Sequence, residues 1–214
     1  MNKILVTYAT MSGSTAEVAR TVAEELTHQG NEVDVLPLSK VTNLASYAAV
    51  VLGAPMLMGW HFSALGFLAK NRRTLRRIPL AIFATGMSLV WHGETELKGI
   101  PVCVDPRQAK PRVNPRRPTI KELHSDIRNY ATPILLFAGP ARPVSLAFFG
   151  GSLDLRKLNL PAKLFVMLVV QAQPGDHRNW PAIRSWAQGL PALFKPAILP
   201  VGADPSVRPL LNPR

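Results

Sequence analysis

The stretch Lys3–Thr15, KILVTYATMSGST, passes from an apolar run into a loop rich in hydroxyl groups. Its first part, Lys3–Tyr8, is apolar and β-branched, which predicts a buried strand. In the following Thr15–Gln29, apolar residues recur four apart and predict one buried face of a helix, which Gly30 ends. A strand, a short polar loop and an amphipathic helix form the first half of a strand–helix–strand unit.

Residues 1–87 repeat this alternation. Three further strands are predicted from short β-branched and apolar runs at Glu32–Leu36, Ala49–Gly53 and Leu80–Thr85. An arginine-rich helix, about Ala64–Arg77, is predicted between the last two of them. Repeats of this length indicate a parallel sheet with helices on both faces.

The rest of the chain divides by composition. Residues 88–118 combine frequent prolines with basic residues, which predicts a long basic insertion loop. Thr119–Tyr130 starts with a capping-box pattern and predicts a helix. A fifth strand is predicted at Val144–Phe149, with Ile134–Phe137 as the alternative, and a final helix at Trp180–Leu193.

These segments predict a single α/β domain over residues 1–195. The proline-rich tail, residues 196–214, is predicted to be extended or disordered. Within the domain, Ala162–Val170 is apolar nearly all round, which fits either a buried helix or a segment that enters a membrane surface. The single cysteine, Cys103, excludes a disulfide framework and a cysteine-cluster metal site.

The loop after the first strand has the chemistry of a phosphate site. In an open parallel sheet, ligands bind beyond the carboxyl ends of the strands. There, a helix N-terminus offers free amide donors and the positive end of its dipole. The hydroxyls of Thr10, Ser12, Ser14 and Thr15 add donors, which predicts a pocket for a dianionic phosphate monoester. The loop matches neither the Walker A nor the GxGxxG pattern, and an ordinary N-cap cluster in a tight turn is the alternative.

The run Val6–Ala19, VTYATMSGSTAEVA, resembles the FMN-phosphate loop of flavodoxins. The matching positions are Tyr8, Thr10, Gly13, Thr15 and Ala19, followed by Val22. Thr7 departs from the pattern, because the family prefers a larger apolar residue at this strand position. Tyr47–Pro55, YAAVVLGAP, resembles the third strand leading to the first isoalloxazine loop. The resemblance implies an α/β flavodoxin-like three-layer sandwich with a five-stranded parallel sheet, in the order 2-1-3-4-5, that binds FMN.

Three further segments are similar to one branch of this fold, the menaquinone-dependent protoporphyrinogen oxidases. They are Met58–Ser63 (MGWHFS), Gly150–Leu158 (GGSLDLRKL) and Pro174–Trp180 (PGDHRNW). The whole resemblance covers about residues 2–194, without the insertion and the tail. It implies an FMN-dependent oxidoreductase that passes electrons from a porphyrinogen through FMN to a quinone.

By this resemblance three loops hold the FMN. The phosphate loop comprises Thr10, Met11, Ser12, Gly13, Ser14 and Thr15. The first ring loop comprises Pro55, Met56, Leu57, Met58, Gly59, Trp60 and His61, and the second comprises Thr85, Gly86, Met87, Ser88 and Leu89. Backbone amides of the ring loops reach the ring atoms that gain charge on reduction. Trp60 either stacks on the ring or covers the core, and His61 either donates to the flavin or a substrate propionate or is a surface histidine. Trp91 is a weaker ring candidate.

Acid–base catalysis has no clear residue in the sequence. Asp154 and Asp176 are the best isolated carboxylates, and both are predicted to cap helices or form turns. No Ser-His-Asp arrangement and no metal-ligand spacing is present, so no metal is expected. Dehydrogenation through a flavin is compatible with that expectation.

The charge balance favours anionic partners. Lys and Arg total 25 against 13 Asp and Glu, a formal net charge of +12. Small electron-carrier flavodoxins are typically acidic, so this charge argues against a simple shuttle. Two basic clusters, Lys70–Arg77 and Arg107–Arg117, together with the apolar Leu164–Val170, predict binding to an anionic membrane surface. No nucleic-acid-binding motif is present, so nucleic acid is not an expected partner.

The sequence thus predicts a cytoplasmic enzyme that is peripheral at the inner face of the cell membrane. No apolar run approaches the length of a membrane span, and the apolar start is too short for a signal-peptide core. Two alternatives to the enzyme remain open. One is a non-catalytic electron-transfer flavodoxin with a protein redox partner, and the other is a flavin-free flavodoxin-like binding module.

Overall fold

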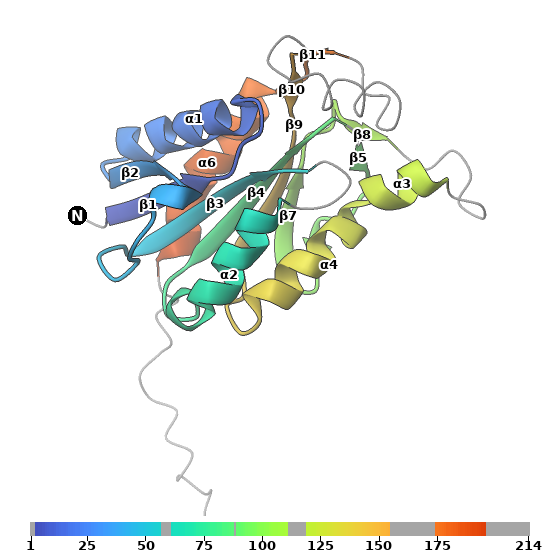
Figure 1. Ribbon diagram of the computed structural model, residues 1–214. Coiled ribbons are helices and arrows are strands. Elements are labelled where there is room, and N and C mark those ends of the chain that lie inside the picture. The colour runs from blue at the N-terminus through green and yellow to red at the C-terminus, as the bar shows by residue number, and fades with distance from the viewer. Residues whose placement is uncertain (1–2, 57–60, 88, 111–118, 155–173, 196–214) are drawn as a thin grey trace, which may run out of the picture.

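The computed structural model describes residues 3–56, 61–87, 89–110, 119–154 and 174–195 (Figure 1). Its centre is a seven-stranded sheet in the order β2-β1-β3-β4-β9-β7-β6. The five strands at its core are parallel to their neighbours: β1 (Lys3–Tyr8), β2 (Glu32–Pro37), β3 (Ala49–Pro55), β4 (Leu80–Gly86) and β9 (Ser145–Gly150). These five strands confirm the predicted order 2-1-3-4-5, with β9 as the fifth.

The described part of the insertion is not the unstructured loop that its prolines predicted. β7 (Ile100–Val104) runs parallel to β9, and β6 (Glu96–Leu97) pairs antiparallel with β7. Two short strands, β5 (Leu89–Val90) and β8 (Ala109–Lys110), form a separate parallel pair. The prediction failed because the apolar residues of β7 pack against the core layers on both sides of the sheet, whereas its single proline is exposed near the strand start, where it is tolerated.

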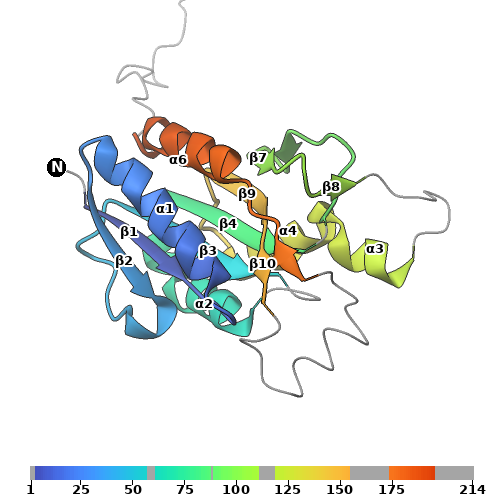
Figure 2. The same cartoon turned by 90° about the horizontal axis from the view of Figure 1, so that it is seen from above.

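Helices cover both faces of the sheet (Figure 2). The helices α1 (Ser14–His28) and α6 (Trp180–Phe194) lie on one face, and α2 (Phe62–Leu75) and α4 (Ile127–Ala138) lie on the other. The three-layer α/β sandwich expected from the sequence is therefore confirmed. A short 3-10 helix, η1 (Leu38–Lys40), follows β2.

The helix predicted at Thr119–Tyr130 is divided into two. Thr119 caps α3 (Ile120–Ser125) with a complete capping box to Glu122, as its sequence predicted. Asp126 then has an extended backbone, and its side chain caps α4 by accepting from the Arg128 amide at 2.9 Å. The alternative strand at Ile134–Phe137 is wrong, because these residues lie in α4, and the strand predicted at Val144–Phe149 is confirmed as β9.

The core consists of two apolar layers, one on each side of the sheet, because strand side chains alternate between the faces. Leu52 and Ile82 pack towards α2 and α4, whereas Phe83 and Phe149 pack towards α1 and α6. Phe83, Phe149 and Trp186 form an aromatic cluster, with ring centroids 5.7 to 6.4 Å apart. Such pairs are worth about 0.5–1.5 kcal/mol beyond their area burial.

The parallel strands end at one edge of the sheet, which we call the carboxyl edge, and begin at the opposite amino edge. At the carboxyl edge β9 leads into β10 (Ser152–Leu153), which pairs with β11 (Gly175–Asp176). The apolar run Ala162–Val170 and the tail at 196–214 lie outside the described residues, so their predictions and the division into domain and tail stay predictions. Among the described helices, none has the length and apolarity needed to cross a bilayer.

Candidate functional site

The β1–α1 loop ends in a helix N-terminus that no described side chain caps. Gly13, at the N-cap, has a φ of 92°, a left-handed conformation that glycine adopts without strain. Its amide donates to Thr10 Oγ1 at 2.9 Å, and its carbonyl accepts the first helical hydrogen bond, from the Glu17 amide. The amides of Ser14, Thr15 and Ala16 therefore remain as donors at the positive end of the helix dipole.

The hydroxyl groups of this loop join it to two neighbouring loops. Thr15 Oγ1 lies 2.8 Å from Thr85 Oγ1 at the end of β4, and both side chains are buried, with Thr15 only 1% exposed. Ser14 Oγ accepts from the amide of Ser152, after β9, at 3.0 Å. Each hydroxyl has one hydrogen and two lone pairs, so Ser14, and one of the two threonines, keep a hydrogen for a ligand.

The two predicted ring loops begin side by side at the ends of β3 and β4. The Met56 amide donates to the Thr85 carbonyl at 2.8 Å, and the Gly151 amide donates to the Gly86 carbonyl at 2.7 Å. A Cβ on Gly86 would lie 3.2 Å from Met56 Cε, so a larger residue would press on the first ring loop. The backbone at these strand ends is thus fixed from both sides.

The remaining predicted site residues differ in how far they are exposed at the carboxyl edge, and some lie outside the described residues. Pro55 ends β3, Ser12 and Met87 are half-buried, and Met11 is 53% exposed. Leu89 is fully buried in the core facing α2 and α4, so only its backbone is available to a ligand. His61 precedes α2, and its Nδ1 lies 2.7 Å from Ser63 Oγ. Leu57, Met58, Gly59, Trp60 and Ser88 lie outside the described residues.

Arg178 is a site residue that the sequence did not single out. Its guanidinium binds Asp176 through Nε and Nη2, at 2.7 and 2.6 Å, and reaches Glu17 Oε2 through Nη1 at 2.5 Å. The guanidinium carbon lies 4.5 Å from the ring centroid of Trp180, and the side chain is 9% exposed. The guanidinium holds the pKa of Asp176 below its usual range.

This arginine changes the electrostatics of the phosphate loop. Glu17 lies in the first turn of α1, where its charge would oppose a bound phosphate. Because Arg178 pairs with it, the first turn carries less net negative charge beside the free amides. Asp176, predicted to form a turn, does so by accepting from the Arg178 amide at 3.1 Å, and it also forms the ion pair. The spacing Asp-x-Arg in PGDHRNW is the only local signal for this clamp.

Asp105 fixes the segment that carries Arg178 through a hydrogen bond to the next residue, Asn179. It follows β7, is fully buried, and its Oδ1 accepts from Asn179 Nδ2 at 2.9 Å and from the Arg107 amide at 3.0 Å. Its Oδ2 has no hydrogen-bond partner among the described residues. Burial, followed by the charge of Asp105, raises the pKa of the Cys103 thiol.

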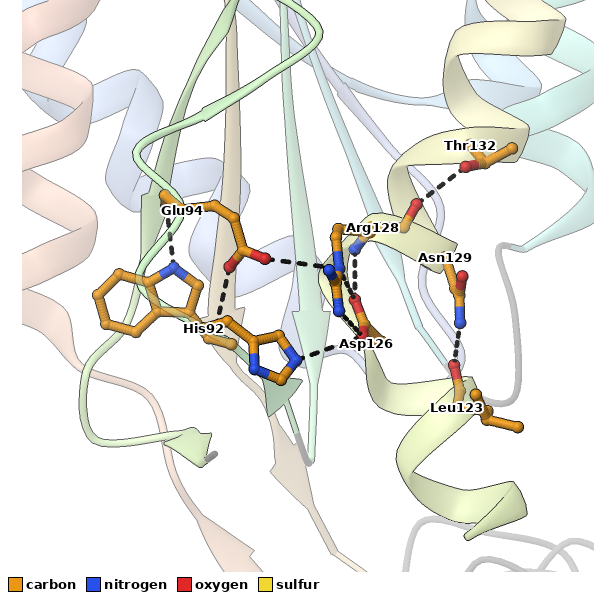
Figure 3. A network of polar contacts seen from close by, with 8 residues as sticks. His92, Glu94, Leu123, Asp126, Arg128, Asn129 and Thr132 are labelled. Atoms are coloured by element: carbon orange, nitrogen blue, oxygen red, sulfur yellow. Dashed lines mark hydrogen bonds and ion pairs between the residues drawn. The ribbon is translucent and has the colours of Figure 1, made fainter. Parts of the chain in front are cut away.

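A polar network fixes the chain where it leaves β5 (Figure 3). Trp91 Nε1 donates to the Glu94 carbonyl at 2.9 Å, and the His92 amide donates to Glu94 Oε2 at 2.8 Å. Arg128 binds Asp126 through Nε and Nη2, at 3.1 and 2.9 Å, and His92 Nε2 lies 3.6 Å from the same carboxylate. The network therefore ties the start of the insertion to the junction of α3 and α4.

The described residues offer no site for a metal. Within the ranges that the structure describes, no group of three or more His, Cys, Asp or Glu side chains is arranged to hold one. Asp154, the second isolated carboxylate of the sequence, is half-buried after β10. The carboxyl edge thus assembles an uncapped helix N-terminus, buried hydroxyl groups and two adjoining backbone loops.

A family model of the flavodoxin domain matches residues 5–179, most of the chain. The chain belongs to the flavodoxin family. Flavodoxins bind FMN and transfer electrons, so the expected fold family and cofactor are confirmed. The match does not extend to the protoporphyrinogen oxidase branch. No curated protein matches the chain.

Solved flavodoxin structures are similar to this flavodoxin over different shares of its length. A flavodoxin of Streptococcus pneumoniae TIGR4 is 11% identical, with 89% of this chain and 98% of that one covered and a TM-score of 0.46. A short-chain flavodoxin associated with a bacterial microcompartment is 25% identical, with 40% and 62% covered and a TM-score of 0.34. Rubredoxin oxygen:oxidoreductase from Desulfovibrio gigas is 17% identical, with 90% and 36% covered and a TM-score of 0.46. This flavodoxin thus spans less than two thirds of the last two chains.

Proposed function

We propose that this flavodoxin binds FMN at the carboxyl edge and acts as an oxidoreductase. The observation that supports this most directly is the uncapped N-terminus of α1, whose amides lie beside the hydroxyls of Ser14 and Thr15. Amide donors and a helix dipole suit a phosphate dianion, and FMN ends in such a group. The donor set therefore fits FMN better than a dinucleotide, whose phosphates are internal.

The proposed site uses three loops. The phosphate is held by Thr10–Thr15, and the ring lies between Pro55–His61 and Thr85–Leu89, as the family resemblance implies. Bound FMN supplies the chemistry of electron transfer to and from its ring. The chain contributes a rigid backbone at both ring loops, since the Met56 amide donates to the Thr85 carbonyl and the Gly86 carbonyl accepts from the Gly151 amide. Arg178 acts as a positioning residue that pairs with Glu17 beside the phosphate.

The finer proposal concerns the substrate. The segments MGWHFS, GGSLDLRKL and PGDHRNW support a porphyrinogen as electron donor and a quinone as acceptor. The described residues of the third segment form the Arg178 clamp at the rim of the proposed site. In this proposal the basic segment 107–117 and the apolar segment 164–170 bring the enzyme to an anionic membrane that contains the quinone.

A non-catalytic electron carrier is the second candidate. It is favoured by Met11 and Phe62, which lie in or next to the proposed FMN loops and are 53% and 89% exposed. Apolar side chains around a redox centre suit transient docking of a protein partner. No described carboxylate is assigned to proton transfer, and an electron carrier needs none.

Titration of the apo-protein separates these possibilities. We expect FMN to bind at least tenfold more tightly than riboflavin, which lacks the phosphate, and more tightly than FAD. Equal binding of FMN and riboflavin would contradict the phosphate site, and no binding of any flavin would favour the flavin-free binding module.

A turnover assay of the FMN-loaded protein separates the enzyme from the carrier. Turnover of protoporphyrinogen with a quinone supports the oxidoreductase. Electron exchange with a protein partner and no such turnover supports the carrier.

A further inference from the structure

The C-terminal ends of α2 and α4 meet at the amino edge, opposite the proposed FMN site. The turn after α2 leads into β4, and the turn after α4 leads into β9, which are adjacent parallel strands. The Val144 amide donates to the Leu80 carbonyl at 2.8 Å, which ties the two turns together. Figure 1 shows both helices ending at the bottom of the view, with β10 and β11 at the top.

This end of the molecule carries a dense positive charge. We call the residues Lys70, Arg72, Arg73, Arg76 and Arg77 the α2 basic cluster; all five are exposed, and none forms an ion pair with a described residue. The sequence has no Asp or Glu between Asp34 and Glu94, nor between Asp126 and Asp154. The C-terminus of a helix carries only about half a negative charge. The dipole of α2 therefore offsets only a small part of the positive charge of the α2 basic cluster.

Two apolar side chains lie at the same end. Leu136 is 74% exposed and Phe137 is 40% exposed, in the last turn of α4. Arg72 reaches α4, since its Cδ lies 4.0 Å from a Cβ built on Gly139, just after the helix. Arg142, in the following turn, is also exposed and donates to the Lys98 carbonyl at 2.6 Å. Exposed cations and an exposed apolar pair thus share this end of the molecule.

We propose that this amino-edge face binds an anionic phospholipid surface. Arginine and lysine attract the phosphate and carboxylate headgroups, and an exposed Leu–Phe pair gains by entering the interface between headgroups and acyl chains. A protein partner that exchanges electrons with FMN needs the carboxyl edge instead. The basic face therefore has a different occupant from the redox site, and the absence of acidic side chains from α2 and α4 matches it to lipid anions.

This contact fixes which side of the protein faces the bilayer. A six-residue strand such as β9 is about 20 Å long, so the proposed FMN site lies at least that far from the amino edge. A protein held by this face presents the carboxyl edge to the aqueous phase, which suits the electron carrier and not the enzyme that reduces a quinone in the bilayer. The face is defined by described residues at the C-terminal ends of α2 and α4, and its binding does not depend on FMN.

The test is co-sedimentation of the full chain with lipid vesicles. One set contains phosphatidylcholine alone, and the other contains phosphatidylcholine with about 30% phosphatidylserine. We expect binding to the anionic vesicles at 50 mM salt and loss of most of it at 1 M salt, because the Debye length falls to about 3 Å. Absence of binding to anionic vesicles at low salt overturns the proposal.

Charge-matched variants locate the surface. The triple variant Arg73→Gln, Arg76→Gln and Arg77→Gln is expected to weaken binding about 100-fold, at about fivefold for each cation. A matched pair of double variants provides the control. Arg76→Gln with Arg77→Gln should weaken binding about 25-fold, whereas Arg20→Gln with Lys40→Gln, at exposed positions elsewhere, should change binding little. Leu136→Ser, at an exposed position, is expected to weaken binding about tenfold through lost apolar burial.

Two results would overturn the assignment. Equal loss in both double variants would mean that net charge, and not this face, drives binding. If vesicles fail to bind, and immobilised polyglutamate retains the wild type but not the α2 variant, the face belongs to an acidic protein. FMN titration and thermal unfolding of each variant verify that the fold and the proposed redox site are intact.

Discussion

The carboxyl and amino edges of this flavodoxin are organised in opposite ways. At the carboxyl edge, polar groups of loops far apart in the sequence bind one another, as Thr15 binds Thr85 and Arg178 binds Glu17. At the amino edge, the α2 basic cluster projects without described ion-pair partners. Interlocked groups give a rigid cradle, which suits the small ligand that we propose for it. Unpaired charges around an apolar pair suit a large, adaptable anionic surface.

The largest expected effect tests the close packing of the carboxyl edge. A Cβ on Gly150 would collide with the backbone carbonyl of His177, so Gly150→Ala should destabilise the protein by about 3 kcal/mol. Gly66, in α2, has open space around it, and Gly66→Ala should stabilise by about 0.5–1 kcal/mol. Urea unfolding measures both. Similar effects of the two substitutions would remove the contrast in packing.

The second prediction tests whether the Thr15 hydroxyl binds the FMN phosphate or only stabilises the loop through Thr85. Thr15→Val keeps the side-chain shape and removes a donor, so FMN affinity should fall about 10- to 100-fold. It also leaves the buried Thr85 hydroxyl without its Thr15 partner, which should lower stability by about 1–3 kcal/mol.

The double variant Thr15→Val and Thr85→Val provides the control, because it removes both buried hydroxyls. Stability should return most of the way to wild type, whereas FMN affinity should stay low. Flavin titration and urea unfolding are measured on the same samples. Wild-type affinity in the Thr15 variant would mean that this hydroxyl braces the loop and does not contact the phosphate.

The third prediction concerns the charge beside the cradle. Arg178→Met leaves Glu17 and Asp176 without their shared cation, so FMN affinity should fall about tenfold through repulsion of the phosphate. Arg184 offers a matched control, since it pairs with Glu25 on the same helix α1, further from the N-terminus. Fluorescence titration of FMN should show little change for Arg184→Met. An equal loss in both variants would assign the effect to α1 stability.

The smallest effect is a pH dependence. The pKa of Asp176 is lowered by Arg178, so its ion pair stabilises the fold fully above the unfolded value of about 3.9. That contribution is lost as pH falls below this value towards the folded pKa. Urea midpoints between pH 5 and pH 3 should therefore fall less steeply in Arg178→Met than in wild type. Arg76→Gln, at the amino edge and without a described carboxylate partner, should keep the wild-type slope.

Local sequence patterns predicted the core architecture well. β1 was predicted with its observed bounds, and both limits of α1 and of β3 lie within two residues of the predicted ones. Alternating apolar strands and amphipathic helices carry this information within a few residues, so a single segment suffices. The insertion was harder, because its prolines and arginines obscured the alternation of β7.

The sequence by itself determined the strand–helix order, the position of the hydroxyl-rich loop for which we propose phosphate binding, and the excess of positive charge. Only the tertiary structure decided which groups meet: Thr15 with Thr85, 70 positions apart, and Glu17 with Arg178, 161 positions apart. It also decided that the α2 cluster and Leu136 share one end of the molecule. Periodicity records which face of an element is buried, whereas long-range pairing depends on how the elements pack around the sheet. That physical difference explains why the fold could be predicted from local pattern and the contacts of its two edges could not.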